Sequence, residues 1–280
     1  MEITFSKKGH AMELRNGDFP YLYFPAIEKT GLVRHLSTTR AGGVSEGYYS
    51  TTNISYTIGD PYENVIENFR RIGKVLDVVP EKMVCTQQTH TINVRRVDER
   101  DCGRGTVRHR EYKDIDGLMT DIPGICLVIY SADCVPLFFL DPVNKAIAMS
   151  HSGWRGTVDL MAVHTVEKMT AEFSTDPMDL ICGIGPSICQ DCYEVSEDVI
   201  DRFCDTFEEK YHDRIFYKKE NGKYRLDLWE TNKIAFLRAG VKEENIHIGG
   251  VCTCCNSKNM FSHRASNGKR GLHGSFMVLN

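Results

Sequence analysis

The sequence predicts a mixed α/β fold, and two observations support this prediction. The middle of the chain contains short apolar or alternating runs bounded by turn residues, a pattern typical of strands. Segments with apolar residues at helical spacing lie on both sides of it. Because several strand runs follow one another with no helix between them, a mixed sheet is favoured over strict alternation of strands and helices. We therefore expect an α/β or α+β protein.

The N-terminal part contains two predicted strands and one predicted helix. The segments 21–27 and 32–38 are rich in aromatic and branched residues, as strands are. Asp60, Pro61 and Glu63 predict a helix start, since an Asp cap, a proline in the first turn and a following acid form a capping box. The apolar face of this helix comprises Val65, Ile66, Phe69, Ile72, Val75 and Leu76.

The middle of the chain predicts a central sheet, and the C-terminal part adds helices. The predicted strands are 83–85, 92–97, 117–120, 125–130, 135–140 and 145–150. Helical spacing follows over 158–169, and 180–184 is a further buried strand. Two more helices are predicted over 197–207 and 227–239, with Gly240 ending the second as its C-terminal cap.

The chain length and the absence of linkers predict one domain. The chain has 280 residues, and single α/β units often reach roughly 250. No Pro, Gly or Ser linker, low-complexity tract or repeat divides it. We therefore expect a single domain over residues 1–280.

Charge and hydropathy exclude several partner classes. A formal charge of −4 and a pI near 6.2 provide no basic surface for nucleic acid or anionic membrane. The mean hydropathy is −0.32, and the most apolar stretch, 125–140, is interrupted by Ser131 and Asp133, which argues against a membrane span. The first ten residues contain no signal-peptide core. We expect a cytoplasmic protein.

The cysteine content is unusual and suggests metal or thiol chemistry. Eleven cysteines are an odd number, so at least one has no internal partner, and their spacing shows no disulfide framework. In a reduced, cytosolic chain this favours metal binding or a reactive thiol, and ten histidines offer companion ligands.

Three candidate metal ligands follow predicted strands. His90, Cys134 and His151 each lie at a strand end, where a side chain is held rigidly and faces an opening. Two imidazoles and one thiolate suit zinc, and three protein ligands leave a position for water. The alternative is a buried free cysteine with two ordinary histidines. Asp133 is a candidate to orient a ligand or relay a proton, and equally to cap the strand end.

Two arginines are candidates for binding an oxyanion such as phosphate. Arg40 lies in a glycine-containing loop, 40–47, with unhindered backbone N–H groups. Arg155 precedes a predicted helix, whose N-terminus attracts negative charge. A hairpin turn and a surface residue are the respective alternatives. Asn53 and Gln88 complete the predicted phosphate- and substrate-binding set.

A second group of cysteines comprises Cys182, Cys189, Cys192, Cys252, Cys254 and Cys255. Cys189 and Cys192 have the two-residue gap of a zinc knuckle. Cys252 with Cys254 or Cys255 would complete four sulfurs. The long separation between the two parts, and the frequency of inert buried thiols, favour the alternative that no metal binds.

Six motifs in order carry a family resemblance. They are TTRAGGVS (38–45), QQTH (87–90), SADCVPLFF (131–139), HSGWRG (151–156), GIGPSICQDCYEV (183–195) and the closing CT with FSHR. The sequence resembles the polyphenol oxidase or laccase-domain family, whose members are described as zinc-dependent purine nucleoside phosphorylases with adenosine deaminase activity. The resemblance implies one α/β domain layered as a sandwich of sheets and helices, with zinc held by His90, Cys134 and His151.

The resemblance also implies substrates. Purine nucleosides (adenosine, inosine, guanosine and methylthioadenosine) would react with inorganic phosphate, which attacks the ribose anomeric carbon as the base leaves. This step needs a positioned phosphate and stabilisation of the departing base. The sequence departs from the family at His263, where tyrosine is usual before the arginine, and at Leu272, where arginine is usual after the glycine. These departures concern substrate preference more than the metal site.

Three other functions stay open. A copper oxidase acting on phenols would use the same ligands with Met149 in an axial position, although scattered histidines disfavour a multicopper centre. A thiol hydrolase would use Cys134 as nucleophile, His151 or His90 as base and Gln88 at an oxyanion. The family resemblance implies the substrate, since relatives have been linked to removing wrong amino acids from cell-wall precursors. The third is a metal-stabilised binding module without turnover. The sequence does not predict an oligomeric state.

Overall fold

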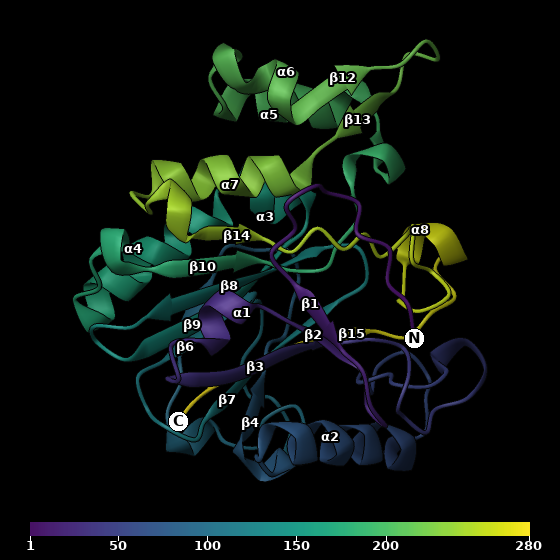
Figure 1. Cartoon of the computed structure of the whole chain (residues 1–280), viewed down its shortest axis with the longest axis vertical. Helices are drawn as coiled ribbons and strands as arrows, with labels where there is room; N and C mark the ends of the chain where they lie inside the picture. Colours follow the sequence, from purple (N-terminus) through teal and green to yellow (C-terminus); the bar gives the residue numbers. More distant parts are fainter.

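The computed structural model describes all 280 residues and contains two six-stranded sheets and one small sheet (Figure 1). The first sheet has the order β1 (Glu13–Arg15), β2 (Tyr21–Tyr23), β3 (Val33–Thr38), β15 (His273–Leu279), β7 (Cys126–Ser131) and β4 (Met83–Cys85). The second has the order β14 (Ile246–Ile248), β10 (Ile181–Ile184), β8 (Val135–Asp141), β9 (Ala146–Ser152), β6 (Gly117–Thr120) and β5 (Val94–Arg96). The small sheet has the order β11 (Glu194–Val195), β13 (Tyr224–Leu226) and β12 (Phe216–Lys218).

Eight helices accompany the sheets. They are α1 (Pro25–Glu28), α2 (Tyr62–Leu76), α3 (Trp154–Val158), α4 (Met161–Phe173), α5 (Glu197–Thr206), α6 (His212–Ile215), α7 (Leu228–Arg238) and α8 (His263–Ser266). Both large sheets are mixed: β4 runs parallel to β7, and β10 runs parallel to β14, while most other pairs are antiparallel. The predicted mixed α/β fold is therefore confirmed.

The two large sheets pack face to face, and helices cover their outer faces. Successive side chains of a strand point to opposite faces, so each central strand serves two apolar layers. On β7, Leu127 and Ile129 belong to the cluster between the sheets, whereas Val128 packs toward α2. On β8, Phe138 faces the first sheet and Phe139 faces the helices. The result is a four-layer sandwich of helix, sheet, sheet and helices.

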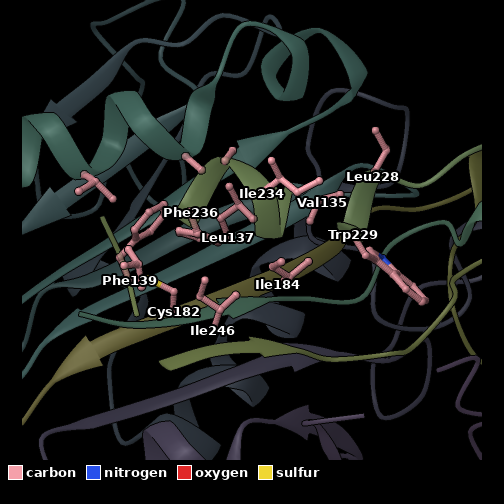
Figure 2. Packing of buried hydrophobic residues seen from close by; sticks show 14 of the residues in the cluster. Val135, Leu137, Phe139, Cys182, Ile184, Leu228, Trp229, Ile234, Phe236 and Ile246 are labelled. Atoms are coloured by element: carbon pink, nitrogen blue, oxygen red, sulfur yellow. The ribbon is translucent and has the colours of Figure 1, made fainter. Parts of the chain in front are cut away.

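The helices of the outer layers bury apolar faces against their sheets. Phe69 of α2 meets Phe276 of β15 edge to face at 6.2 Å between ring centroids. On the other side, Phe236 of α7 packs against Phe139 of β8 with 5.2 Å between ring centroids, and Trp229 lies near the end of β10 and donates to Ser187 Oγ (Figure 2). In Figure 1, α2 lies below the first sheet, and the small sheet with α5 and α6 extends above α7.

Three local predictions are wrong. Segment 21–27 is strand only to Tyr23, because Pro25 starts α1. Helix α2 has no side-chain cap: the Asp60 carboxylate accepts hydrogen bonds from Ser45 Oγ (2.6 Å) and Asn53 Nδ2 (2.8 Å). The helix expected over 158–169 is interrupted at Leu160, which has a left-handed backbone (φ 62°) and separates α3 from α4.

None of the helices combines the length and the apolar composition that crossing a membrane requires. A single domain over residues 1–280 stays a prediction.

Candidate active site and metal centre

Three side chains from separate segments meet at one end of the sandwich. His90 lies in the connection from β4 to β5, and Cys134 lies in the connection from β7 to β8; both connections carry the chain from the first sheet to the second. His151 lies near the end of β9. One ligand atom from each lies within 4.8 Å of the other two. The structure thus brings together the three residues selected from the sequence.

Asp116, just before β6, organises both histidines. Its buried carboxylate lies 2.9 Å from His151 Nδ1, which leaves Nε2 of that ring for a ligand. The same carboxylate accepts the backbone N–H groups of Thr89, His90 and Thr91 at 2.9–3.1 Å. These bonds hold the left-handed backbone of His90 (φ 65°). A carboxylate that orients a ligating histidine is the usual support of a protein metal site.

Cys134 and His151 form a charged pair. Burial would raise the pKa of the Cys134 thiol, but the charge of His151 and hydrogen bonds from His151 and His90 lower it from 9.0 to about 6. For His151, burial acts to lower the pKa, while the Cys134 thiolate and Asp116 raise it to about 9. The arrangement therefore favours a thiolate, the form of cysteine that binds metals and attacks electrophiles.

Gly153 leaves space for the ligands. A Cβ atom at this position would lie 3.0 Å from both Cys134 Sγ and His90 Cδ2, which is closer than nearly all real Cβ contacts. The glycine of the HSGWRG motif therefore has a steric role beside the candidate metal ligands.

The three candidate ligands line a cavity of about 370 Å³. Its remaining walls are mostly polar and comprise Ser55, Tyr56, Thr57, Gln87, Gln88, Thr89, Arg110, Tyr130, Ser131, Ala132, Arg270 and Leu272. Ligand sites for small molecules have volumes of roughly 300–1,000 Å³. The cavity is thus large enough for a small polar molecule in contact with His90, Cys134 and His151.

Several polar atoms in the cavity wall lack partners within the chain. Arg270 Nε, Gln87 Oε1 and Tyr56 Oη are buried and accept or donate no hydrogen bond. Buried polar groups are nearly always paired, so unpaired ones in a cavity wall suggest a ligand that pairs with them. Arg110 also lines the cavity, and its Nη1 donates to the Thr86 carbonyl.

The two arginines predicted to bind phosphate lie outside this cavity. Arg40 donates to the carbonyls of Ser50 and Ser257 at 3.0 Å and lines a different, smaller hollow. Arg155 is exposed, and its guanidinium stacks on the Trp154 ring at 4.4 Å. Among the cavity's wall residues, Arg110 and Arg270 provide the positive charge.

The other predicted polar residues mainly hold loops. Asn53 is buried and bonds Asp60 and the backbone of Ser55 and Leu272. Gln88 lines the cavity, but its amide is engaged by both backbone groups of Tyr130. The Asp133 carboxylate accepts from Thr253 Oγ1 (2.6 Å) and from the Arg264 N–H (2.7 Å).

The sequence did not predict that Asp116 would contact His151, nor that Gln87, Arg110 and Arg270 would line the cavity. Asp116 immediately precedes a predicted strand, as a residue at a strand end should, but lone aspartates are common before strands. Gln87 belongs to the QQTH motif, in which only the neighbouring Gln88 was predicted to bind substrate. Arg110 and Arg270 lie in segments with no periodic pattern, so only the folded chain shows that they face one cavity.

Fold and cavity together define a mixed α/β protein with a candidate three-ligand metal centre. The family model for multi-copper polyphenol oxidoreductase laccase matches residues 34–280. The chain belongs to this family, which is a metal-binding one. Only one other group of His, Cys, Asp or Glu side chains could hold a metal, and it contains cysteines alone, so the histidines form no multicopper cluster.

The relatives of the chain carry enzyme names. A protein from Bacteroides thetaiotaomicron named purine nucleoside phosphorylase is 34% identical over 89% of this chain and 93% of its own length. A protein named adenosine deaminase RL5, from an unknown prokaryotic organism, is 33% identical over 83% of this chain and 88% of its own. The prediction that the chain is an enzyme is confirmed.

Solved structures confirm the fold. The crystal structure of the Bacillus licheniformis hypothetical protein YfiH has a TM-score of 0.89 and 31% identity, covering 95% of this chain and 99% of that one. YlmD from Geobacillus stearothermophilus has a TM-score of 0.87 and 29% identity, with complete coverage of both chains. The layered sandwich is therefore the common fold of these proteins.

Proposed function

We propose that the chain is a zinc-dependent purine nucleoside phosphorylase that also deaminates adenosine. The observation that carries the proposal is the polar cavity that combines His90, Cys134 and His151 with two arginines. The names of the relatives supply the reaction class. Candidate substrates are adenosine, inosine, guanosine and methylthioadenosine, with inorganic phosphate as the second substrate of phosphorolysis.

The donor set fits zinc. Two imidazoles and a thiolate are borderline to soft ligands, and three protein ligands are typical of a catalytic rather than a structural zinc ion. His90, Cys134 and His151 would hold the ion, and Asp116 fixes the tautomer of His151. When bound, zinc would supply a Lewis acid and a bound water with a pKa of about 7.

In phosphorolysis, a phosphate oxygen forms a bond to C1′ of the ribose while the bond from C1′ to the purine nitrogen breaks. The electron pair of that bond goes to the base, which takes up a proton. Arg270 and Arg110 would hold the phosphate dianion, because guanidinium groups bind phosphate with paired hydrogen bonds and Arg270 Nε has no partner in the chain. This replaces Arg40 and Arg155 as the proposed phosphate ligands.

In deamination, water adds to the carbon that bears the amino group of adenosine, and ammonia leaves. The cavity wall offers Gln87 Oε1 as an acceptor and Tyr56 Oη as a donor or acceptor for the polar edge of a purine or ribose. Both reactions would then use one cavity. We place the enzyme in the cytoplasm, a proposal supported by the eleven free cysteines.

The test is a product analysis on protein whose metal content has been measured. With phosphate, inosine should give hypoxanthine and ribose 1-phosphate; without phosphate, adenosine should give inosine and ammonia while inosine stays unchanged. Metal-loaded protein that converts none of the candidate nucleosides under either condition would refute the proposal. Base release that is independent of phosphate would identify a hydrolase instead.

One arrangement favours a second candidate, a thiol hydrolase. The nucleophile would be Cys134, with His151 as its base and Asp116 as the carboxylate that orients His151. His151 also lowers the pKa of Cys134, which favours the reactive thiolate. Gln88 is engaged elsewhere and does not serve as an oxyanion donor. Metal-free protein that cleaves an amide of a cell-wall precursor, and loses this activity when Cys134 is alkylated, would support the hydrolase; the same activity is not expected from zinc-loaded protein.

A further inference from the structure

Four cysteines form a second cluster away from the cavity. Cys189 precedes a 3-10 turn between β10 and β11, and Cys192 is the last residue of that turn. Cys252 and Cys255 lie in the segment that follows β14. Their four Sγ atoms all lie within 4.8 Å of one another. None of the four lines the cavity that contains Cys134.

We propose that Cys189, Cys192, Cys252 and Cys255 bind a second metal ion, a structural zinc. The sulfur atoms of Cys189 and Cys255 are 3.9 Å apart, and those of Cys192 and Cys255 are 3.4 Å apart. Zinc with four thiolates at about 2.3 Å places the sulfurs about 3.8 Å from one another. A disulfide would need about 2.05 Å. The cluster therefore has the spacing of a tetrahedral metal site.

Two backbone N–H groups point at the sulfur of the buried member of the cluster. The N–H of Cys189 lies 3.3 Å from Cys252 Sγ, and the N–H of Cys255 lies 3.4 Å from the same atom. Cys252 has no exposed surface. Hydrogen bonds of this kind hold and orient the ligands of a metal site.

The two cysteine pairs are far apart in the sequence, but the second large sheet brings them together. Strands β10 and β14 are parallel neighbours, so the segments that follow them leave the sheet side by side. The pairing continues beyond the strands, because the Ser187 N–H donates to the Val251 carbonyl and the Thr253 N–H donates to the Ser187 carbonyl, both at 3.1 Å. Two C-x-x-C pairs, each suited to one edge of a zinc site, are thereby placed face to face.

The structure also distinguishes the ligands from the neighbouring cysteines. Cys255, three residues after Cys252, joins the cluster, whereas Cys254 does not. Cys182 lies inside β10 in the apolar layer beneath α7 (Figure 2). Cys204 is exposed on α5 and belongs to no cluster. It therefore provides a matched control.

A metal at this position would support the segment that carries Cys134. Thr253, between two of the ligands, donates to the carboxylate of Asp133, and the Ile188 N–H donates to the Asp133 carbonyl at 3.0 Å. Asp133 has a left-handed backbone (φ 89°) immediately before Cys134. The four-cysteine site therefore joins the two segments that fix this strained turn, and its role is structural and independent of the proposed reaction.

The test measures zinc per folded chain in protein purified under reducing conditions. Wild type and Cys204→Ser should contain two zinc ions, whereas Cys134→Ala and Cys255→Ser should each contain one. Cobalt added to the metal-free Cys134→Ala protein should give the intense sulfur-to-metal charge-transfer bands of a tetrahedral four-thiolate site. This measurement does not depend on whether Cys255→Ser folds, nor on any activity of the protein.

Three results would overturn the proposal. One is a Cys134→Ala protein that binds no zinc or cobalt at saturating metal. Another is an intramolecular disulfide among the four cysteines, found by mass spectrometry without reductant. The third is a Cys255→Ser protein that retains the four-thiolate cobalt spectrum. A failure of nucleoside turnover, by contrast, would refute only the proposed function.

Discussion

The molecule contains two clusters of soft ligands that differ in composition and in surroundings. The cluster of His90, Cys134 and His151 has mixed nitrogen and sulfur donors and forms part of a cavity wall. The four-cysteine cluster has only sulfur donors and lies outside that cavity. Three protein ligands leave a metal position open to substrate, whereas four close it. The number of ligands and their surroundings, rather than the presence of cysteine, thus separate a candidate catalytic site from a candidate structural one.

The positions of the two clusters in the fold explain the difference. The mixed cluster lies where the chain passes twice between the sheets, so two of its members come from these connections and the third, His151, comes from the end of β9. The four-cysteine cluster lies beyond two parallel neighbours of one sheet, β10 and β14, whose continuing pairing brings the turns together. The first position has a cavity large enough for a small molecule, whereas the second brings four sulfur atoms within reach of one another.

The largest expected effect separates the two clusters by activity. Cys134→Ala should lower both nucleoside reactions by at least about 10³-fold, which corresponds to roughly 4 kcal/mol, because it removes a proposed zinc ligand. The cluster of His90, Cys134 and His151 is called the open centre below. The measurement is steady-state turnover of adenosine and inosine. Cys204→Ser is the control and should retain wild-type turnover. Activity in Cys134→Ala near the wild-type level would remove the distinction between a catalytic and a structural cluster.

The sequence predicted which three candidate ligands would come together, but not the carboxylate that orients them. His90, Cys134 and His151 follow strand runs that are recognisable from local patterns, so their selection needed no tertiary information. Asp116 accepts from residues 89 to 91 and from His151, which is contact information that no local pattern contains. Arg270 was missed for the same reason, since it follows α8 in a segment without periodicity.

The fold was predicted in class and only partly in detail. Strands β7, β8 and β9 are almost fully buried and read clearly as apolar runs. Strand β15 was missed, although it lies between β3 and β7 in the first sheet, because Gly274 and Ser275 interrupt its apolar pattern. The prediction that Asp60 caps α2 is wrong because the Asp60 carboxylate accepts hydrogen bonds from Ser45 and Asn53 instead. These two residues approach Asp60 only in the folded chain.

The second prediction concerns a substitution of Asp116, which should change zinc affinity at the open centre alone. Asp116→Asn should weaken zinc binding at the open centre by about 10–100-fold, because the amide no longer stabilises the tautomer of His151 or accepts as strongly from residues 89 to 91. Competition with a chromogenic chelator should show one ion released more readily. The ion at the four-cysteine cluster should be released as in wild type, since Asp116 does not contact it. Equal weakening at both clusters would show that Asp116 acts through global stability instead.

The smallest expected effect tests whether Arg270 binds phosphate beside the open centre. Arg270→Gln should raise the KM for phosphate by roughly 10-fold, because the variant loses a charge-assisted hydrogen bond to a dianion. Deamination of adenosine needs no phosphate and should change little, so the ratio of the two activities is the informative quantity. Arg155→Gln is the matched control: it removes a guanidinium that stacks on Trp154 outside the cavity and should leave both activities unchanged. If Arg270→Gln lowered both reactions equally, the residue would position the nucleoside or the metal ligands, and the phosphate would have to bind at Arg110 or outside the cavity.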